Sequence, residues 1–163
     1  MAKINDKKTN AMRQLDNDKI PYSVLTYDCD GENFDGRLVA RQVGLPCSQV
    51  FKTLVARGNN GIVVCCIPVD KKLDLKSLAA ACGMKKLEML HVSEILGVTG
   101  YIRGGCSPIA MKKTYDTYID DSACDLDTIA ISAGVRGKQI VLAASDLISY
   151  TQAVTGAFSA PMD

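Results

Sequence analysis

A lysine inside a predicted β-strand is the first residue that suggests chemistry. Lys52 lies in residues 50–56, a segment rich in β-forming side chains, and its neighbours Phe51 and Leu54 are apolar. An ammonium group among apolar side chains is costly unless an anion compensates its charge. The residues alone leave two interpretations open: an edge strand whose lysine reaches water along its own stem, or a cation that binds a ligand's negative charge.

Two clusters of small residues could line a ligand site. The loop 104–108 contains paired glycines followed by a serine and a proline: Gly104, Gly105, Ser107 and Pro108. Glycines let a backbone approach a ligand closely, and such loops offer backbone N–H groups to a phosphate or a carbonyl oxygen. The second cluster is Ser132-Ala133-Gly134, at the end of a predicted strand. Each cluster also fits an ordinary tight turn.

Histidine and cysteine usage limits the other chemistries. The chain has one histidine, His91, and seven cysteines, at positions 29, 47, 65, 66, 82, 106 and 124. One histidine excludes a histidine-rich metal site, and no two cysteines form a Cys-x-x-Cys pair. We therefore expect no metal, no cofactor and no disulfide, and interpret nearly all of the cysteines as small buried apolar side chains. A catalytic Cys-His pair would need His91, whose sequence setting indicates packing or capping.

The elements that must position these residues follow from apolar periodicity and from capping signals. The predicted strands are 22–27, 50–56, 62–67, 114–119, 128–132 and 139–143, of which the second and third form a hairpin around the turn 58–61. The predicted helices are 10–15, 36–43, 75–82, 94–96 and 146–154. Their expected N-caps are Thr9, Asp35, Asp74, Ser93 and Ser145. The third and fourth helices are expected to stop at Gly83 and Gly97.

These elements predict an α+β fold. Strands outnumber what helices could cross over in strict alternation, so we expect a mixed β-sheet flanked by helices. The 163 residues fit one domain spanning 1–163, with its core at about 9–155. The longest apolar run, 62–67, is far too short to cross a bilayer, and the first residues lack the apolar stretch of a signal peptide. We therefore expect a cytoplasmic protein.

The net charge of +1 gives no general case for nucleic-acid binding, but its distribution permits one. Five aspartates crowd into residues 116–127, a stretch without Lys or Arg. The remaining 19 basic and 13 acidic residues leave a surplus of six positive charges. A basic surface that contacts a limited stretch of RNA is allowed, as is a uniformly solvated surface.

Three features in this order resemble the YbaK family. They are Phe51-Lys52-Thr53-Leu54, then Gly104-Gly105-x-Ser107-Pro108 with Lys112-Lys113, then Asp127-Thr128 with Ser132-Ala133-Gly134-x-Arg136-Gly137. The resemblance runs from about Thr9 through the last predicted helix. That family comprises Cys-tRNA(Pro) deacylases, relatives of the editing domain in bacterial prolyl-tRNA synthetases. The resemblance implies a barrel-like mixed sheet and the trans-editing removal of cysteine from mischarged tRNA(Pro).

The resemblance also implies roles for particular residues. Lys52 corresponds to the essential lysine of the family and would hold a phosphate or an ester oxygen of the aminoacyl-adenosine. The substrate-binding residues would be Tyr22, Thr53, Gly104, Gly105, Ser107, Pro108, Ser132 and Gly134. The cysteine's own thiol would attack its ester, which fits the absence of an evident nucleophile and base. The partner would be the 3′ end of tRNA(Pro), with prolyl-tRNA synthetase as a further candidate.

Two departures from the family pattern affect the expected pocket. Ala110 stands where the family commonly has glycine, and Cys106 places a thiol where an aliphatic residue is common. Three other functions remain open: an Ala-tRNA(Pro) deacylase of the same fold that uses water, a non-catalytic aminoacyl-tRNA-binding factor, and a thiol redox protein. The last lacks the Cys-x-x-Cys pair that such proteins use.

Overall fold

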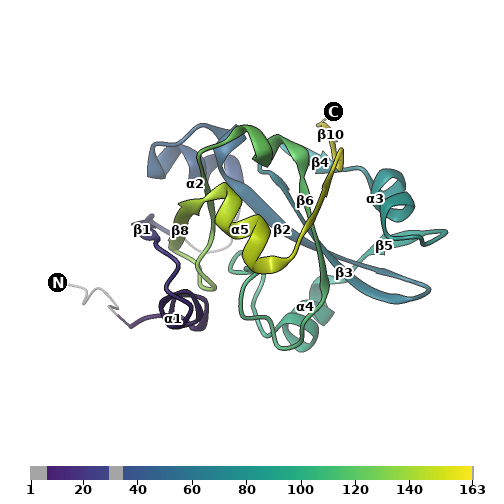
Figure 1. The fold of residues 1–163 in the computed structure, drawn as a ribbon, viewed down its shortest axis with the longest axis horizontal. Coiled ribbons are helices and arrows are strands. Elements are labelled where there is room, and N and C mark those ends of the chain that lie inside the picture. The colour runs from purple at the N-terminus through teal and green to yellow at the C-terminus, as the bar shows by residue number, and fades with distance from the viewer. Residues whose placement is uncertain (1–6, 30–34, 163) are drawn as a thin grey trace.

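A five-stranded mixed sheet forms the centre of the molecule. The computed structural model describes residues 7–29 and 35–162 (Figure 1). In spatial order the strands of this sheet are β5 (Leu87–Met89), β2 (Phe51–Gly58), β3 (Gly61–Pro68), β6 (Asp116–Asp120) and β9 (Val154–Gly156). The predicted hairpin is confirmed, because β2 and β3 pair antiparallel and turn at Gly58 and Gly61. β6 runs parallel to both β3 and β9. Residues 63–68 of β3 are buried, as a continuous apolar run in a covered strand requires.

A second sheet lies against the start of β2. It is antiparallel, in the order β1 (Ser23–Thr26), β8 (Lys138–Ala143) and β7 (Thr128–Ser132). A parallel bridge between Val50 and Ala130 joins the two sheets at this point. A third, two-stranded sheet pairs β10 (Ser159–Pro161) with β4 (Lys71–Leu73). The expected barrel-like sheet is therefore wrong in detail, since the strands described here divide into three sheets and close no barrel. The mixed α+β architecture is confirmed.

Within the described residues, five α-helices and two 3₁₀ turns surround the sheets. The helices are α1 (Asn10–Asn17), α2 (Gly36–Val43), α3 (Leu75–Ala81), α4 (Val92–Thr99) and α5 (Ala144–Thr151), and the 3₁₀ turns are η1 (Cys47–Gln49) and η2 (Asp121–Asp125). Thr9, Asp35 and Asp74 cap α1, α2 and α3 through their side chains, as predicted. Figure 1 places α1 and β1 at one end of the molecule and α3 with β5 at the other. None of the described helices is long and apolar enough to span a membrane.

The structure corrects the predicted bounds of two helices. Ser93 does not cap α4, which begins after His91, continues through Gly97 and ends at Gly100 with φ of 82°. A glycine inside a helix costs only about 1 kcal/mol, so Gly97 does not stop it, whereas Gly100 supplies the left-handed C-terminus. The last helix begins at Ala144 without a side-chain cap from Ser145.

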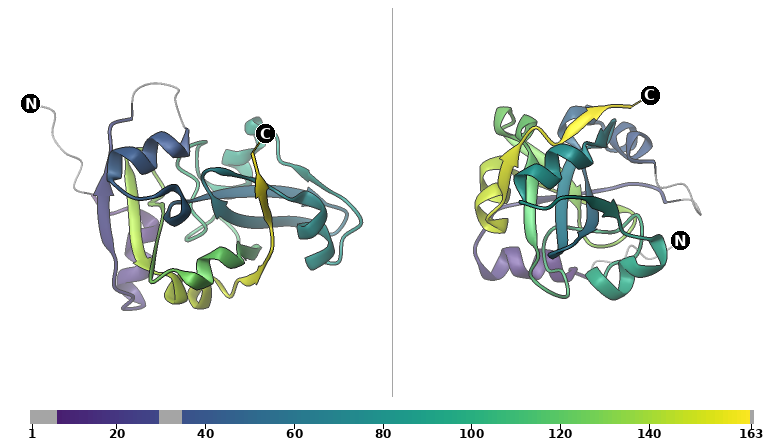
Figure 2. Two further views of the ribbon diagram at one scale, coloured as in Figure 1. Left: turned by 90° about the horizontal axis from the view of Figure 1, so that it is seen from above. Right: turned by 90° about the vertical axis from the view of Figure 1, so that its right-hand side faces the viewer.

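Four short strands were not predicted from the sequence. The strands β4, β5, β9 and β10 have three residues each, too few for a periodic signal. Buried isoleucines and leucines of one cluster pack α1 and α5 against the second sheet. Figure 2 shows the ribbon from two further sides, with both helices beside that sheet. The expectation that nearly all cysteines are buried is wrong. All seven are free, but only Cys65 and Cys66 are buried, while Cys29 and Cys124 are exposed.

Candidate functional site

A cavity of about 570 Å³ opens where the two larger sheets meet. Its floor is the first half of β2, and its walls come from the N-terminus of α2, the loop before Pro108, and the facing strands β7 and β8. The lining residues include the following side chains: Tyr27, Asp35, Lys52, Thr53, Leu54, Met89, Leu90, Ile95, Arg103, Cys106, Ser132 and Gln139. Elements far apart in sequence therefore converge on the cavity.

Lys52 is the basic residue on the floor of this cavity, and Arg103 is a second basic residue in its lining. Lys52 lies on β2 opposite Ile67 of β3, and its side chain is half-buried. Burial lowers the pKa of the ammonium, while the more distant carboxylates Asp35 and Asp70 act in the opposite direction. Within the described parts of the chain, no carboxylate approaches the Lys52 ammonium closely enough to form an ion pair. The wall thus presents a partly desolvated positive charge to whatever occupies the cavity.

The N-terminus of α2 is fixed beside Lys52 by capping and close packing. The Asp35 carboxylate accepts a hydrogen bond from the Arg37 backbone N–H at 3.0 Å. It also forms an ion pair with the Arg37 guanidinium at 2.9 Å. This contact with Arg37 holds the pKa of Asp35 below its usual range. Gly36 has no room for a side chain, since a Cβ there would lie 2.5 Å from the Val69 side chain. Sequence reasoning identified Asp35 only as a helix cap.

The loop 104–108 lines the cavity through Gly104 and Cys106, while its other residues do not line it. Gly104 lines the cavity and has φ of 86°, in the region that favours glycine. Gly105 packs against the turn between β7 and β8, where an added Cβ would lie 3.2 Å from the Val135 backbone. Ser107 is fully buried, and its hydroxyl accepts a hydrogen bond from the Ile109 N–H at 3.3 Å. Pro108 lines a separate cavity.

Ala110 makes the backbone bend for which the family commonly has glycine. Its φ is 62°, so alanine adopts the left-handed conformation that glycine would enter without strain. The neighbouring Ile109 carbonyl accepts a hydrogen bond from the Tyr101 hydroxyl, which holds this segment in place. The alanine therefore adopts a strained left-handed conformation, and neighbouring contacts such as this hydrogen bond offset the strain.

Two residues meet across β7 and β8 on the cavity wall. Ser132 and Gln139 are register partners, and both line the cavity. Gln139 is 6% exposed, and its Oε1 finds no hydrogen-bond donor in residues 7–29 and 35–162. A buried acceptor without a partner costs about 1–3 kcal/mol. No local sequence signal marks Gln139; only its register with Ser132 could have done so.

The cysteines near the cavity are poor nucleophiles. Cys106 lines the cavity, and burial raises the pKa of its thiol to about 11. Burial also raises the pKa of Cys66, beside Thr53, to about 12. The reactive form of cysteine is the thiolate. Neither side chain therefore supplies a nucleophile near neutral pH.

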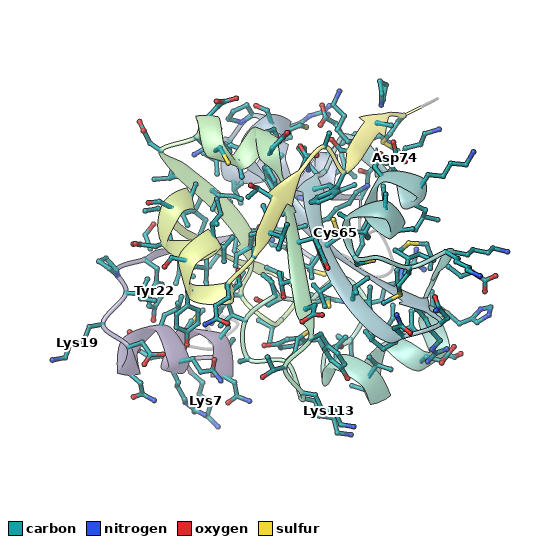
Figure 3. The ribbon with its side chains drawn as sticks, turned by 45° about the vertical axis from the view of Figure 1, so that its right-hand side comes forward. Lys7, Lys19, Tyr22, Cys65, Asp74 and Lys113 are labelled. Carbon is teal, nitrogen blue, oxygen red and sulfur yellow. The ribbon has the colours of Figure 1, made fainter. Side chains whose placement is uncertain are left out.

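The structure brings together part of the predicted residue set. Lys52, Thr53, Gly104 and Ser132 line the cavity. Gly105 and Ser107 belong to the loop 104–108 but do not line the cavity, while Pro108 and Gly134 face two other cavities. Tyr22 packs near α1 and α5, beside Asp16, and does not line the cavity (Figure 3).

The arrangement favours binding over covalent catalysis by the protein. No histidine lines the cavity, and no group of three or more His, Cys, Asp or Glu in the described residues could hold a metal ion. The cavity lining offers the Lys52 ammonium, the Arg103 side chain and the Gln139 amide, together with the apolar side chains of Leu54, Met89 and Ile95. Such a cavity can hold a carbonyl or phosphate oxygen at one end and a small apolar group at the other.

Known proteins with similar sequences or structures point in one direction. A family profile described as "Aminoacyl-tRNA editing domain" matches residues 37–150. The Enterococcus faecalis (strain ATCC 700802 / V583) protein named "Putative Cys-tRNA(Pro)/Cys-tRNA(Cys) deacylase EbsC" is 45% identical over 91% of this chain and 92% of its own length. A "Proline--tRNA ligase" of Thermosipho africanus (strain TCF52B) is 32% identical over 46% of this chain and 13% of its own.

The fold recurs in solved structures. The crystal structure of a "putative trans-editing enzyme for prolyl tRNA synthetase" superimposes with a TM-score of 0.77 over 85% of this chain and 87% of the other. Its sequence is 19% identical, so this likeness establishes the fold alone.

Proposed function

Because the chain belongs to the aminoacyl-tRNA editing domain family, we propose that it is a trans-editing deacylase that removes cysteine from mischarged Cys-tRNA(Pro). The observation that carries the proposal is Lys52, a half-buried ammonium on the cavity floor that no carboxylate of the described residues approaches within ion-pair distance. Such a cation is stabilised when a negatively charged group of a substrate enters. The relative that is 45% identical bears a matching name.

The cavity suits the aminoacyl ester at the tRNA 3′ end. Lys52 would face the ester or an adjoining phosphate and stabilise the negative charge that develops on the carbonyl oxygen. Thr53, Ser132 and the backbone at Gly104 line the same space and would position the ester. Tyr22, Gly105, Ser107, Pro108 and Gly134 do not line the cavity, so the proposal gives them no direct contact with the ester.

The nucleophile would come from the substrate. The thiolate of the attached cysteine attacks its own ester carbon, the bond from that carbon to the tRNA 3′ oxygen breaks, and a proton returns to this oxygen. The products are a cyclic thioester of cysteine and free tRNA. The enzyme has only to hold the ester and stabilise charge, consistent with the absence of a nucleophile-and-base pair from the residues that line the cavity.

The relation to a synthetase and the site of action follow from the same proposal. The match to part of a prolyl-tRNA ligase supports action on tRNA(Pro) that this synthetase has mischarged. The enzyme would meet its substrate in the cytoplasm, where tRNA is charged.

The decisive experiment compares three charged forms of one tRNA. Purified protein is incubated with Cys-, Ala- and Pro-tRNA(Pro), and loss of the ester is followed. We expect fast loss of cysteine and little loss of proline. Faster loss of alanine would replace the proposal with an alanine-specific enzyme that uses water, and binding without loss of any ester would make the protein a non-catalytic factor.

The enzyme's own cysteines should be dispensable for turnover. Their raised pKa values leave little thiolate at Cys66 and Cys106. We expect Cys106→Ser to keep the rate on Cys-tRNA(Pro) within about threefold, because only the shape of one wall changes slightly. The measurement is single-turnover deacylation. Complete loss of activity with tRNA binding preserved would make Cys106 the nucleophile.

Gln139 is expected to lower the stability of the fold and to raise the affinity of the site for the substrate. Replacing it with leucine removes the unpartnered Oε1, so Gln139→Leu should raise the free energy of unfolding by about 1 kcal/mol. The same change removes a polar group from the site and should raise KM for Cys-tRNA(Pro) several-fold. Urea unfolding and steady-state kinetics measure the two effects. Leu142→Met, in the core on the same strand, is the control, since it leaves the cavity unchanged. An unchanged KM would show that Gln139 does not contact the substrate.

A further inference from the structure

A second cavity lies beside the candidate site, across the turn between β7 and β8. It measures about 430 Å³ and is formed by the start of α1, the residues that follow α4, and that turn. Four of its ten lining residues are basic and none of the ten is acidic; the basic ones are Lys7, Lys8, Arg136 and Lys138. We refer to this cavity as the basic groove.

The basic groove and the candidate site share a wall. Arg136 lines the groove, and its Nε donates a hydrogen bond at 2.9 Å to the carbonyl of Arg103, which lines the site. On β8, Lys138 lines the groove and the next residue, Gln139, lines the site. Because consecutive side chains of a strand point to opposite faces, the two cavities lie on opposite sides of the start of β8, and a ligand that occupies both must pass around the turn between β7 and β8.

The charge of the basic groove continues along its rim. The Lys112 backbone N–H donates to the Thr99 carbonyl at 2.9 Å, so Lys112 lies next to Gly100 of the groove. Figure 3 shows Lys7 and Lys113 along the same edge of the molecule, where Lys113 lines the separate cavity that contains Pro108. Lys8 contributes less, because its ammonium pairs with Asp16 at 2.5 Å. Several separated cations suit a ligand with repeated phosphates better than a single anion.

The opposite rim of the candidate site has a different character. Met89 lines the site and is 43% exposed, and Val92 and Leu96 on α4 are more exposed still. A phosphate backbone gains nothing from these apolar side chains. The charge asymmetry between the two rims selects the direction in which a polyanion leaves the site.

We propose that the basic groove binds the sugar-phosphate backbone of the tRNA 3′ strand while the terminal aminoacyl-adenosine occupies the candidate site. This inference rests on the proposed function for the identity of the RNA. Contacts to phosphates fix position and carry no sequence information. The groove therefore supplies affinity and register, and selection of the amino acid stays with the cavity that contains Lys52.

The test uses the double variant Lys7→Gln/Lys138→Gln, which removes two positive charges, keeps polar side chains of similar length and changes no residue that lines the candidate site. Binding of a fluorescently labelled, uncharged acceptor-stem minihelix with its CCA end is measured over a range of KCl concentrations. We expect affinity to fall about tenfold and the salt slope to shrink by roughly 1.4, since each neutralised phosphate of a single strand contributes about 0.7. The control is Lys76→Gln/Lys85→Gln, two exposed lysines in and just after α3, at the far end of the molecule (Figure 1).

Kinetics provide the second arm. The kcat/KM of Lys7→Gln/Lys138→Gln should fall with Cys-tRNA(Pro) and stay at the wild-type value with cysteinyl-adenosine, which has no phosphate. Two results would overturn the proposed role of the groove: a wild-type salt slope in the double variant, or an equal fall in kcat/KM on both substrates. A wild-type protein that binds the minihelix through these lysines but cleaves no ester would instead overturn the proposed function and leave the groove standing.

Discussion

Lys52→Ala is expected to abolish deacylation of Cys-tRNA(Pro), with a loss of about 10²–10³-fold in single-turnover rate. The ammonium is the one basic group on the cavity floor, and removal of one group that stabilises developing negative charge typically costs this much. The fold should survive, because no carboxylate of residues 7–29 and 35–162 is paired with Lys52 and would be left without its partner. Circular dichroism and thermal unfolding check that point.

Two further variants sharpen this test. Lys52→Arg should also fail, because the wider guanidinium cannot place its charge at the same point. Lys76→Ala removes an exposed lysine on α3 and should behave as wild type. Near-normal turnover by Lys52→Ala, with substrate binding intact, would remove Lys52 from the mechanism.

The state of the Lys52 ammonium also predicts an alkaline limit. Burial disfavours the charged form and lowers the pKa of Lys52 below the ordinary 10.5. Activity that needs the ammonium is therefore complete below that lowered pKa and is lost as pH rises through it. The rate on Cys-tRNA(Pro), corrected for spontaneous hydrolysis, should fall at a pH below 10.5.

Ser-tRNA(Pro) should be a far poorer substrate than Cys-tRNA(Pro), by about 10²-fold or more. The two side chains are nearly isosteric, so a cavity that discriminates by size alone would separate them only weakly. Their chemistry differs much more, since a thiol with a pKa near ~8.5 supplies some thiolate at neutral pH and a hydroxyl supplies practically none. Single-turnover rates on both esters measure the difference.

The same mechanism predicts the pH profile and the product. The rate on the cysteine ester should rise with pH through the titration of the substrate thiol, before the alkaline limit set by Lys52. The cyclic thioester should be detectable by mass spectrometry or trapped by an added amine. Ala-tRNA(Pro) is the matched control, because it lacks a side-chain nucleophile. Comparable rates on the serine, alanine and cysteine esters would sink this mechanism and favour water as the nucleophile.

Much of the local structure could be predicted from the residues themselves. Thr9, Asp35 and Asp74 each cap a helix with a side-chain oxygen, and this signal depends on neighbouring residues only. The hairpin of β2 and β3 follows from two apolar runs around a glycine-rich turn. The three-residue strands could not be found this way, because pairing with distant partners is what makes them strands.

The candidate site could likewise be predicted only in part from the sequence. The sequence by itself determined that Lys52 is a cation in an apolar strand and that two clusters of small residues follow it much later in the chain. Only the tertiary structure decided which of these residues meet: Ser132 and Gly104 reach the cavity, whereas Tyr22 and Gly134 do not. Gln139 enters the site solely through its register with Ser132. The physical reason is that a residue's type and immediate neighbours set its local conformation, while convergence depends on how sheets pack, which no single segment encodes.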